Sequence, residues 1–276
     1  MDKKNLHKQY RIGDFARFLG VTPEYLKHYE ESGLLEVSQR SSGYRYYPFD
    51  QSAKVIEYLK LRNYGVPIKE MGEMLSADPE TAVALIDGKC EALRREADRI
   101  GAILEAHRAL RKWYEERRQT PIDWEIRKVE PYYFLPHTTS QDFIRDESVS
   151  DLFKDWGGWL PVVKSAMSVN QAAEDVSEVL HWGLAVTKSE LERYRMPLSG
   201  AARLMTFGRC FVYHFAALRN AFKMADIVSG MHPALAQMRE LGLRSAGEAL
   251  LIDEFQLERP EDGAELGFGH FIIPIA

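Results

Sequence analysis

The chain has 276 residues, of which 45% are hydrophobic and 28% charged, a globular balance that excludes wholesale disorder and fibrous repeats. No apolar run approaches a membrane span, the charged start MDKKNLHKQYRIGDF lacks a secretory core, and two cysteines indicate a reducing cytoplasm rather than a disulfide framework. The net charge of −5 is uneven, with 12 Lys and Arg against 10 Asp and Glu over residues 1–75, but 15 against 22 over residues 121–276.

Short helices separated by glycine and proline are predicted for residues 10–75. The second of them is the clearest, because Thr22 can cap its N-terminus and Pro23 suits its first position. Turn residues followed by aromatic residues predict a small hairpin over residues 38–47. Two further helices are expected over residues 49–64 and 68–75.

Residues 79–118 are predicted to form one long helix, since they contain no internal proline. Alternating steps of four and three residues pick out a mostly apolar seam of Ile86, Cys90, Leu93, Ala97, Ile100, Leu104, His107, Arg111 and Tyr114. Forty helical residues would extend about 60 Å, too far for this seam to be buried against a small domain. We therefore expect a homodimer held by an antiparallel coiled coil over residues 77–120. Cys90 and His107 are expected to pack in the seam, and we predict no metal site.

The rest of the chain, residues 121–276, alternates strands with helices. Strands are expected over residues 123–138, 180–187, 202–207, 210–217, 248–257 and 266–275, and helices over 149–167 and 225–241, the second kinked or broken at Pro233. Two β-α-β-β units in tandem would form a mixed or antiparallel sheet with helices on one side. The fold class is therefore α+β.

The front segment carries the most specific motifs. YRIGDFARFLGVTPEYLKHYEESGLL resembles the helix-turn-helix of MerR-family transcription regulators, SSGYRYYPFD resembles their wing, and LRNYGVPIKEMGEML resembles their second helix pair. The resemblance runs in order over about residues 10–75. It implies an all-α winged helix-turn-helix domain over residues 1–76, double-stranded promoter DNA as the ligand, and RNA polymerase as a partner.

The resemblance assigns candidate DNA contacts, which need polar or basic side chains at base edges and phosphates. The exposed face of the recognition helix is expected to carry Thr22, Tyr25, Lys27 and His28, and the wing Ser42, Gly43, Tyr44 and Arg45. Arg17, Arg62 and Lys69 are expected to bind the flanking phosphate backbone. The alternative is that these are surface side chains of a small helical domain. Tyr29 is expected in the core, and Glu24 stands where the family frequently has a basic residue, which predicts an unusual target or affinity.

Residues 121–276 resemble the GyrI-like effector domain of multidrug-sensing MerR regulators, through HWGLAVTK, TFGRCFVYHFAAL, GEALLIDE and FGHFIIPI. The resemblance implies a cleft between the two repeats for lipophilic, often cationic, compounds, with an acidic residue at its bottom that Glu248 matches best. We expect six aromatic side chains around this cleft: Trp182, Tyr213, Phe215, Phe255, Phe268 and Phe271. Alternatively the aromatic residues form the core, and Glu248 pairs with Arg203 or Arg209.

Three functions fit these residues. The first is a dimeric DNA-binding transcription regulator that distorts promoter DNA when a small lipophilic or cationic effector binds. The second is a GyrI-like small-molecule hydrolase, but the chain shows no Ser-His-Asp order, nucleophile elbow or metal set. The third is an effector-free regulator or drug-binding sponge whose last domain only packs. The sequence favours the first, and predicts no enzyme activity, no cofactor and no membrane partner.

Overall fold

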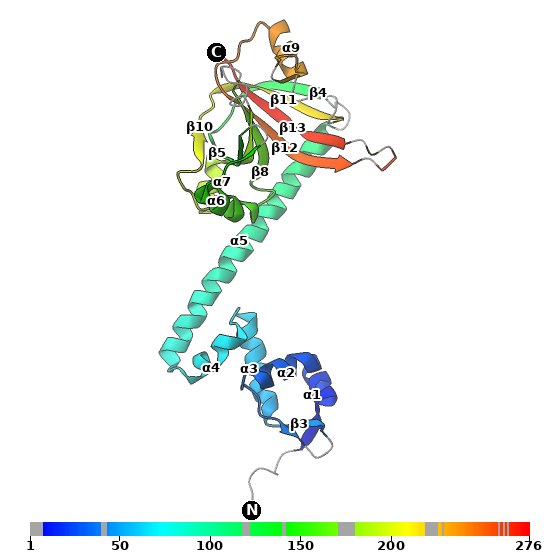
Figure 1. Ribbon diagram of the computed structural model, residues 1–276, viewed down its shortest axis with the longest axis vertical. Helices are drawn as coiled ribbons and strands as arrows, with labels where there is room; N and C mark the ends of the chain where they lie inside the picture. The colour runs from blue at the N-terminus through cyan, green and yellow to red at the C-terminus, as the bar shows by residue number, and fades with distance from the viewer. Residues whose placement is uncertain are drawn as a thin grey trace, which may run out of the picture. The chain divides into compact units, whose positions relative to one another are not determined.

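The computed structural model describes residues 8–39, 43–117, 122–139, 142–170, 180–218, 226–227, 229–258, 260–261, 263 and 265–276. The chain divides into two compact units, Met1–Ala97 and Asp98–Ala276, which are drawn together in Figure 1. Within the described residues, none of the helices has both the length and the apolar composition needed to cross a bilayer.

The first unit is helical with a small antiparallel sheet in the order β1-β3-β2. Its elements are β1 (Gln9–Arg11), α1 (Ile12–Leu19), α2 (Pro23–Glu31), β2 (Ser38–Gln39), β3 (Arg45–Pro48), α3 (Gln51–Asn63) and α4 (Ile68–Ser76). Gly20 ends α1 in the left-handed region, at a φ of 67°, where a side chain would be strained. The Thr22 hydroxyl accepts a hydrogen bond from the Tyr25 amide, so the predicted N-cap of α2 is present.

Helix α5 (Pro79–Arg117) continues from the first unit into the second without a break. Its first turns pack on the first unit through Ile86, and the Lys89 ammonium lies 2.7 Å from the Glu70 carboxylate. Within the second unit, Ala102 is buried against the sheet domain with Ile103 and Ala106 beside it. The long helix predicted from the absence of internal proline is therefore observed.

The second unit is built on an eight-stranded antiparallel sheet in the order β10-β5-β9-β8-β12-β13-β11-β4. Its strands are β4 (Ile122–Lys128), β5 (Tyr132–Pro136), β8 (Lys164–Val169), β9 (Leu180–Thr187), β10 (Arg203–Met205), β11 (Arg209–Leu218), β12 (Ala249–Glu258) and β13 (Glu265–Pro274). The small hairpin β6 (Thr138–Thr139) and β7 (Asp142–Phe143) lies outside it. The helices are α6 (Glu147–Gly157), α7 (Lys188–Arg193) and α9 (Pro233–Glu240).

The predicted tandem repeat is visible in this order of elements. One β-α-β-β unit is β5-α6-β8-β9 and the other is β11-α9-β12-β13, and they join where β8 pairs with β12 at the middle of the sheet. Buried side chains from β11 and β13 pack with α9, and others from β5 and β9 pack with α6. A third buried cluster, which includes Phe134, Val212, Ile252 and Ile272, forms from side chains that alternate with these along the strands.

Three expected elements have different bounds. The strand predicted over residues 123–138 is two strands, β4 and β5, and the helix predicted over 149–167 ends at Gly157 before β8 begins. The helix predicted over 225–241 is broken rather than kinked at Pro233 in its described part. Helix α9 instead begins there, because proline suits the first helical position and the His232 ring accepts from the Ala234 amide.

Candidate functional site

The exposed side of α2 carries alternating charges at its surface. The Lys27 ammonium lies 3.8 Å from the Glu24 carboxylate, and the His28 ring lies 3.9 Å from the Glu31 carboxylate. These pairs are one helical turn apart and water-exposed, so each contributes little and can be exchanged for a phosphate or a base edge. Thr22 is also exposed at the N-terminus of the helix.

Tyr25 does not lie on this exposed face as expected. Its ring stacks on that of Tyr29 with 4.4 Å between centroids, its hydroxyl is buried, and the Arg62 guanidinium lies 5.5 Å from the ring centroid. The reason is helical periodicity: residue 25 is one position from the buried Leu26 and four from the buried Tyr29. Tyr25 thus joins α2 to α3, while Tyr29 lies in the core as predicted.

The wing is formed by β2, β3 and the residues between them, of which Ser42 lies outside the described residues. Gly43 has a φ of 75°, in the left-handed region. Tyr44 is exposed, with the Arg11 guanidinium 4.8 Å from its ring centroid. Arg45 is held from one side, because its Nε donates to the Glu30 carboxylate at 3.0 Å.

Three further cations were expected beside the DNA backbone. Arg62 and Lys69 are exposed. Arg17 is exposed as well and lies 2.8 Å from the Asp14 carboxylate one turn earlier on α1. The first unit therefore presents basic side chains from α1, α2, α3, α4 and the wing, all of them at the surface.

Residues 10–78 match the family model described as "MerR HTH family regulatory protein". This N-terminal region is a MerR-family helix-turn-helix domain. The nodulation protein NolA of Bradyrhizobium elkanii is 34% identical over 94 residues, which cover 34% of this chain and 39% of NolA. The HTH-type transcriptional activator TipA of Streptomyces coelicolor is 38% identical over 74 residues, 25% of this chain and 29% of TipA. The match thus spans less than two-fifths of either relative.

Solved structures give looser similarities. A cryo-EM structure of an EcmrR–DNA complex in EcmrR-RPo aligns over 96% of this chain and 99% of that chain, with a TM-score of 0.37 and 14% identity. A crystal structure of HiNmlR, a MerR family regulator lacking the sensor domain and bound to promoter DNA, aligns over 41% of this chain and 95% of that chain. Its TM-score is 0.33 and its identity 18%.

In the second unit, a cluster of charged side chains lies at the middle of the eight-stranded sheet. The Lys164 ammonium on β8 lies 2.6 Å from the Glu254 carboxylate on β12, and the two side chains are only 20% and 12% exposed. The pairing of β12 with β13 slips between Asp253 and Phe255, so Glu254 is the extra residue of a β-bulge. We call Lys164, Glu254, His214 and His270 the midline cluster.

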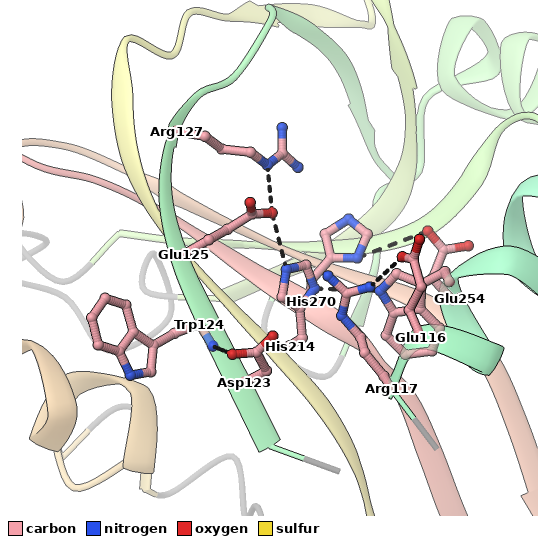
Figure 2. Close-up of polar contacts among 10 residues, drawn as sticks. Glu116, Arg117, Asp123, Trp124, Glu125, Arg127, His214, Glu254 and His270 are labelled. Carbon is pink, nitrogen blue, oxygen red and sulfur yellow. Dashed lines mark hydrogen bonds and ion pairs between the residues drawn. The ribbon is translucent and has the colours of Figure 1, made fainter. Parts of the chain in front are cut away.

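Two histidines complete the midline cluster, and hydrogen bonds determine which ring nitrogen of His214 carries the proton. The Trp113 indole can only donate, and its Nε1 lies 3.3 Å from His214 Nδ1, so Nδ1 accepts. His214 Nε2 therefore carries the proton and donates to Glu125 at 3.2 Å, as Figure 2 shows beside the Glu125–Arg127 pair. Burial lowers the pKa of His214, which agrees with a neutral ring.

The second histidine, His270 on β13, is neutral and incompletely bonded. Burial, together with the nearby charges of Lys164, Arg127 and Arg117, lowers its pKa to about 3. Its Nδ1 has no hydrogen-bond partner among the described residues and lies 3.9 Å from the Glu254 carboxylate (Figure 2). A buried ring nitrogen beside a carboxylate can bond a hydroxyl or ammonium group placed between them.

The structure does not bring the predicted effector residues together. Four of them lie in or against the core cluster beside α9, because strand alternation turns them to that face: Trp182, Tyr213, Phe215 and Phe271. Glu248 precedes β12 and lines a pocket of about 370 Å³ together with Arg203. Both terminal nitrogens of Arg203 donate to the Glu248 carboxylate, so the ion pair predicted as the alternative is present. Glu254, six residues later, lies beside Lys164 at the junction of the two repeats.

The other two predicted residues, Phe255 and Phe268, line a groove of about 270 Å³ beside the midline cluster. The opposite wall is the end of α5, with Leu110, Trp113 and Tyr114. Trp113 belongs to this aromatic groove and also bonds His214, so the groove and the cluster share one side chain.

Sequence reasoning missed Lys164, Glu254, His214 and His270. A signal was present, because Asp253 and Glu254 interrupt an apolar strand with two consecutive acids, only one of which can face solvent in a regular strand. Within the described residues, no group of three or more His, Cys, Asp or Glu side chains is arranged to hold a metal ion.

Proposed function

We propose that the chain is a dimeric DNA-binding transcription regulator that responds to a small effector bound in its second unit. The MerR-family helix-turn-helix domain over residues 10–78 is the observation that carries this proposal. The exposed basic side chains of that domain support contacts to promoter DNA, and RNA polymerase is the expected partner at the promoter.

Dimerisation is supported by the seam of α5. Leu93, Ile100 and Leu104 are large apolar side chains that remain exposed along it. The opposite face is already used, since Ala102 is buried and the Glu105 carboxylate lies 3.0 Å from the Arg193 guanidinium. A partner helix that covers the seam would remove these side chains from water and hold two recognition helices at a fixed spacing.

We place the effector in the aromatic groove, with its polar end toward the midline cluster. The rings of Trp113, Tyr114, Phe255 and Phe268 suit a lipophilic body. The Glu254 carboxylate and the Nδ1 of His270, for which the described part of the chain offers no hydrogen-bond partner, supply polar contacts for an ammonium or hydroxyl group. The effector is therefore proposed to be lipophilic and to carry a cation or another hydrogen-bond donor.

The same position offers a route from effector to DNA. Trp113 belongs to α5, which continues unbroken into the DNA-binding unit, and its indole donates to His214 in the sheet. A ligand that displaces the Trp113 ring would change how the end of α5 is held. This change is the differential contact that an effector needs in order to favour one conformation of the dimer over another.

Binding experiments test the effector site directly. We would titrate the dimer calorimetrically with a lipophilic quaternary ammonium compound and with its neutral isostere, using wild type, Glu254→Gln and Glu248→Gln. The proposal expects Glu254→Gln to weaken the cation at least tenfold, about 1.4 kcal/mol, and Glu248→Gln to leave it unchanged. Equal affinities for all three proteins, or a loss only in Glu248→Gln, would contradict the proposed position.

Gel-shift assays with promoter fragments test the regulator itself. The proposal expects the wild-type dimer to bind selected duplex DNA and the effector to change the bend or untwisting of that DNA rather than release it. A wild-type protein that binds no duplex DNA above background would contradict the proposed function.

A further inference from the structure

One carboxylate in the first unit joins the recognition helix to the wing. Glu30 is the second-last residue of α2, and it is only 17% exposed although its neighbour Glu31 is 73% exposed. Its carboxylate accepts from Arg45 Nε at 3.0 and 3.4 Å and from the Tyr47 hydroxyl at 3.2 Å. Both donors come from β3, the strand of the wing that starts at Arg45.

The contact is rigid on the wing side. Tyr47 is fully buried, and its ring stacks on Phe15 of α1 with 5.2 Å between centroids and 5° between ring planes. Strand β3 is paired with β1 through Tyr47 and Tyr10. Burial and the Glu30 charge both raise the pKa of Tyr47, so its hydroxyl keeps the proton that it donates to Glu30.

The contact also orients Arg45. The hydrogen bonds to Glu30 come from Nε, and the guanidinium carries two terminal amino groups besides. An arginine fixed at Nε presents its terminal amino groups in one direction, as bidentate phosphate contact requires. A free arginine would lose side-chain entropy on binding DNA that this one has already lost on folding.

We propose that Glu30 is a positioning residue for DNA binding, which holds Arg45 and the wing strand at a fixed distance from the recognition helix. The proposal rests on the proposed function, since it assumes that both elements contact the same duplex. Glu30 itself does not touch DNA in this proposal. Its negative charge near the duplex is unfavourable, and it is tolerated because the geometry that it fixes benefits specific binding.

A comparison of the affinities for a selected duplex and for a scrambled duplex distinguishes this positioning role from a general structural role. Nonspecific binding depends on the total positive charge and needs no fixed spacing between wing and helix. Glu30→Gln should therefore weaken binding to a duplex selected by the wild type about tenfold, and leave binding to a scrambled duplex unchanged or slightly stronger. A merely structural defect would lower both affinities in parallel with the thermal melt.

The matched control is Glu31→Gln, which removes the same charge from the same helix end without touching the wing. A double-mutant cycle adds the decisive measurement. In an Arg45→Gln background, Glu30→Gln should lower the affinity for the selected duplex by less than about twofold, because the group that Glu30 positions is absent. If Glu30→Gln lowers the melting temperature, Tyr47→Phe, which removes only one hydroxyl, replaces it in the experiment. Tyr47→Phe should again weaken binding to the selected duplex more than binding to the scrambled one.

The outcomes divide cleanly. Equal affinities of Glu30→Gln and Glu31→Gln for the selected duplex would overturn the positioning role. So would losses of affinity from the Glu30 and Arg45 substitutions that simply add. In both cases, wild-type DNA binding would still support the proposed function. Failure of the wild type to bind any duplex would instead overturn the proposed function.

Discussion

The ion pairs on α2 of the first unit and in the midline cluster of the second differ in how far they are buried. On α2 of the first unit, ion pairs join exposed residues one helical turn apart, as in Lys27 with Glu24 and His28 with Glu31. In the second unit, Lys164 and Glu254 pair across 90 positions of sequence and are mostly buried. The first arrangement leaves charges available to a large polyanion, and the second surrounds a small volume with fixed polar groups. The difference suits a surface that binds DNA and an interior that selects a small molecule.

The largest expected effect concerns the helix that both units share. Replacing Ile100 and Leu104 with Asp places like charges in the proposed seam and should give monomers whose affinity for a selected duplex falls at least about 100-fold. Sedimentation and gel shifts measure the two effects. Arg95→Asp, an exposed change away from the seam, is the control and should leave a dimer. An unchanged dimer in the double mutant would show that the seam does not hold it.

The contrast in burial predicts a contrast in stability. Lys164→Met leaves the Glu254 carboxylate buried without its partner and should lower the free energy of unfolding by about 3–5 kcal/mol. Lys188→Met in the same unit breaks an exposed pair with Glu192 and should cost less than about 1 kcal/mol. Urea unfolding of both variants compares them. Similar losses would mean that burial does not distinguish these ion pairs.

Acid should destabilise the second unit through His270. Because the pKa of His270 is lowered to about 3 from 6.5, the unfolded chain binds its proton first as the pH falls below 6.5. The folded form therefore loses stability between pH 6.5 and about 3, by as much as roughly 1.4 kcal/mol per pH unit for this group. Thermal melts from pH 7 to pH 4 should show a shallower decline in His270→Gln. A decline as steep as that of wild type would assign the acid sensitivity to other groups.

The smallest expected effect concerns phosphate contact by the wing. Arg45→Ala should weaken both duplexes and reduce the salt dependence by about one unit of slope, with the larger loss for the selected duplex because that complex also needs the fixed position of Arg45. Lys27→Ala should instead reduce discrimination between duplex sequences at a nearly unchanged slope. Fluorescence anisotropy across a salt series measures both. A salt slope unaltered by Arg45→Ala would remove Arg45 from the phosphate contacts.

The first unit was predictable because its signals are local. Thr22 and Pro23 define the start of α2 within two residues, and Gly20 ends the helix before it. The family motifs follow the chain in order, and the structure has the predicted helices and wing. The prediction that Tyr25 lies on the exposed face of α2 was wrong, because the helical period does not show how wide the buried face of a short helix is.

The candidate site of the second unit was not predictable in the same way. The tandem repeat could be anticipated from alternating patterns, but Glu254 meets Lys164 only because β8 pairs with β12, and a bulge decides which way it faces. Glu248 was the reasonable choice by motif, and its pairing with Arg203 depends on β10, which lies at the far edge of the sheet. Long-range register carries information that composition and spacing do not contain.

The bulge at Glu254 also has a consequence for how this sheet tolerates change. Deleting Glu254 would restore strict alternation and leave Phe255 and the later positions of β12 opposite their present partners, because Asp253 and Phe255 pair with the adjacent residues Gly269 and Phe268 of β13. Phe255 and Leu257 would then stay in the groove, whereas the carboxylate that pairs with Lys164 would be lost. The extra residue thus adds a carboxylate to the midline cluster without disturbing the register of the strand, so the gain or loss of a single codon would add or remove this charge and leave the aromatic wall of the groove in place.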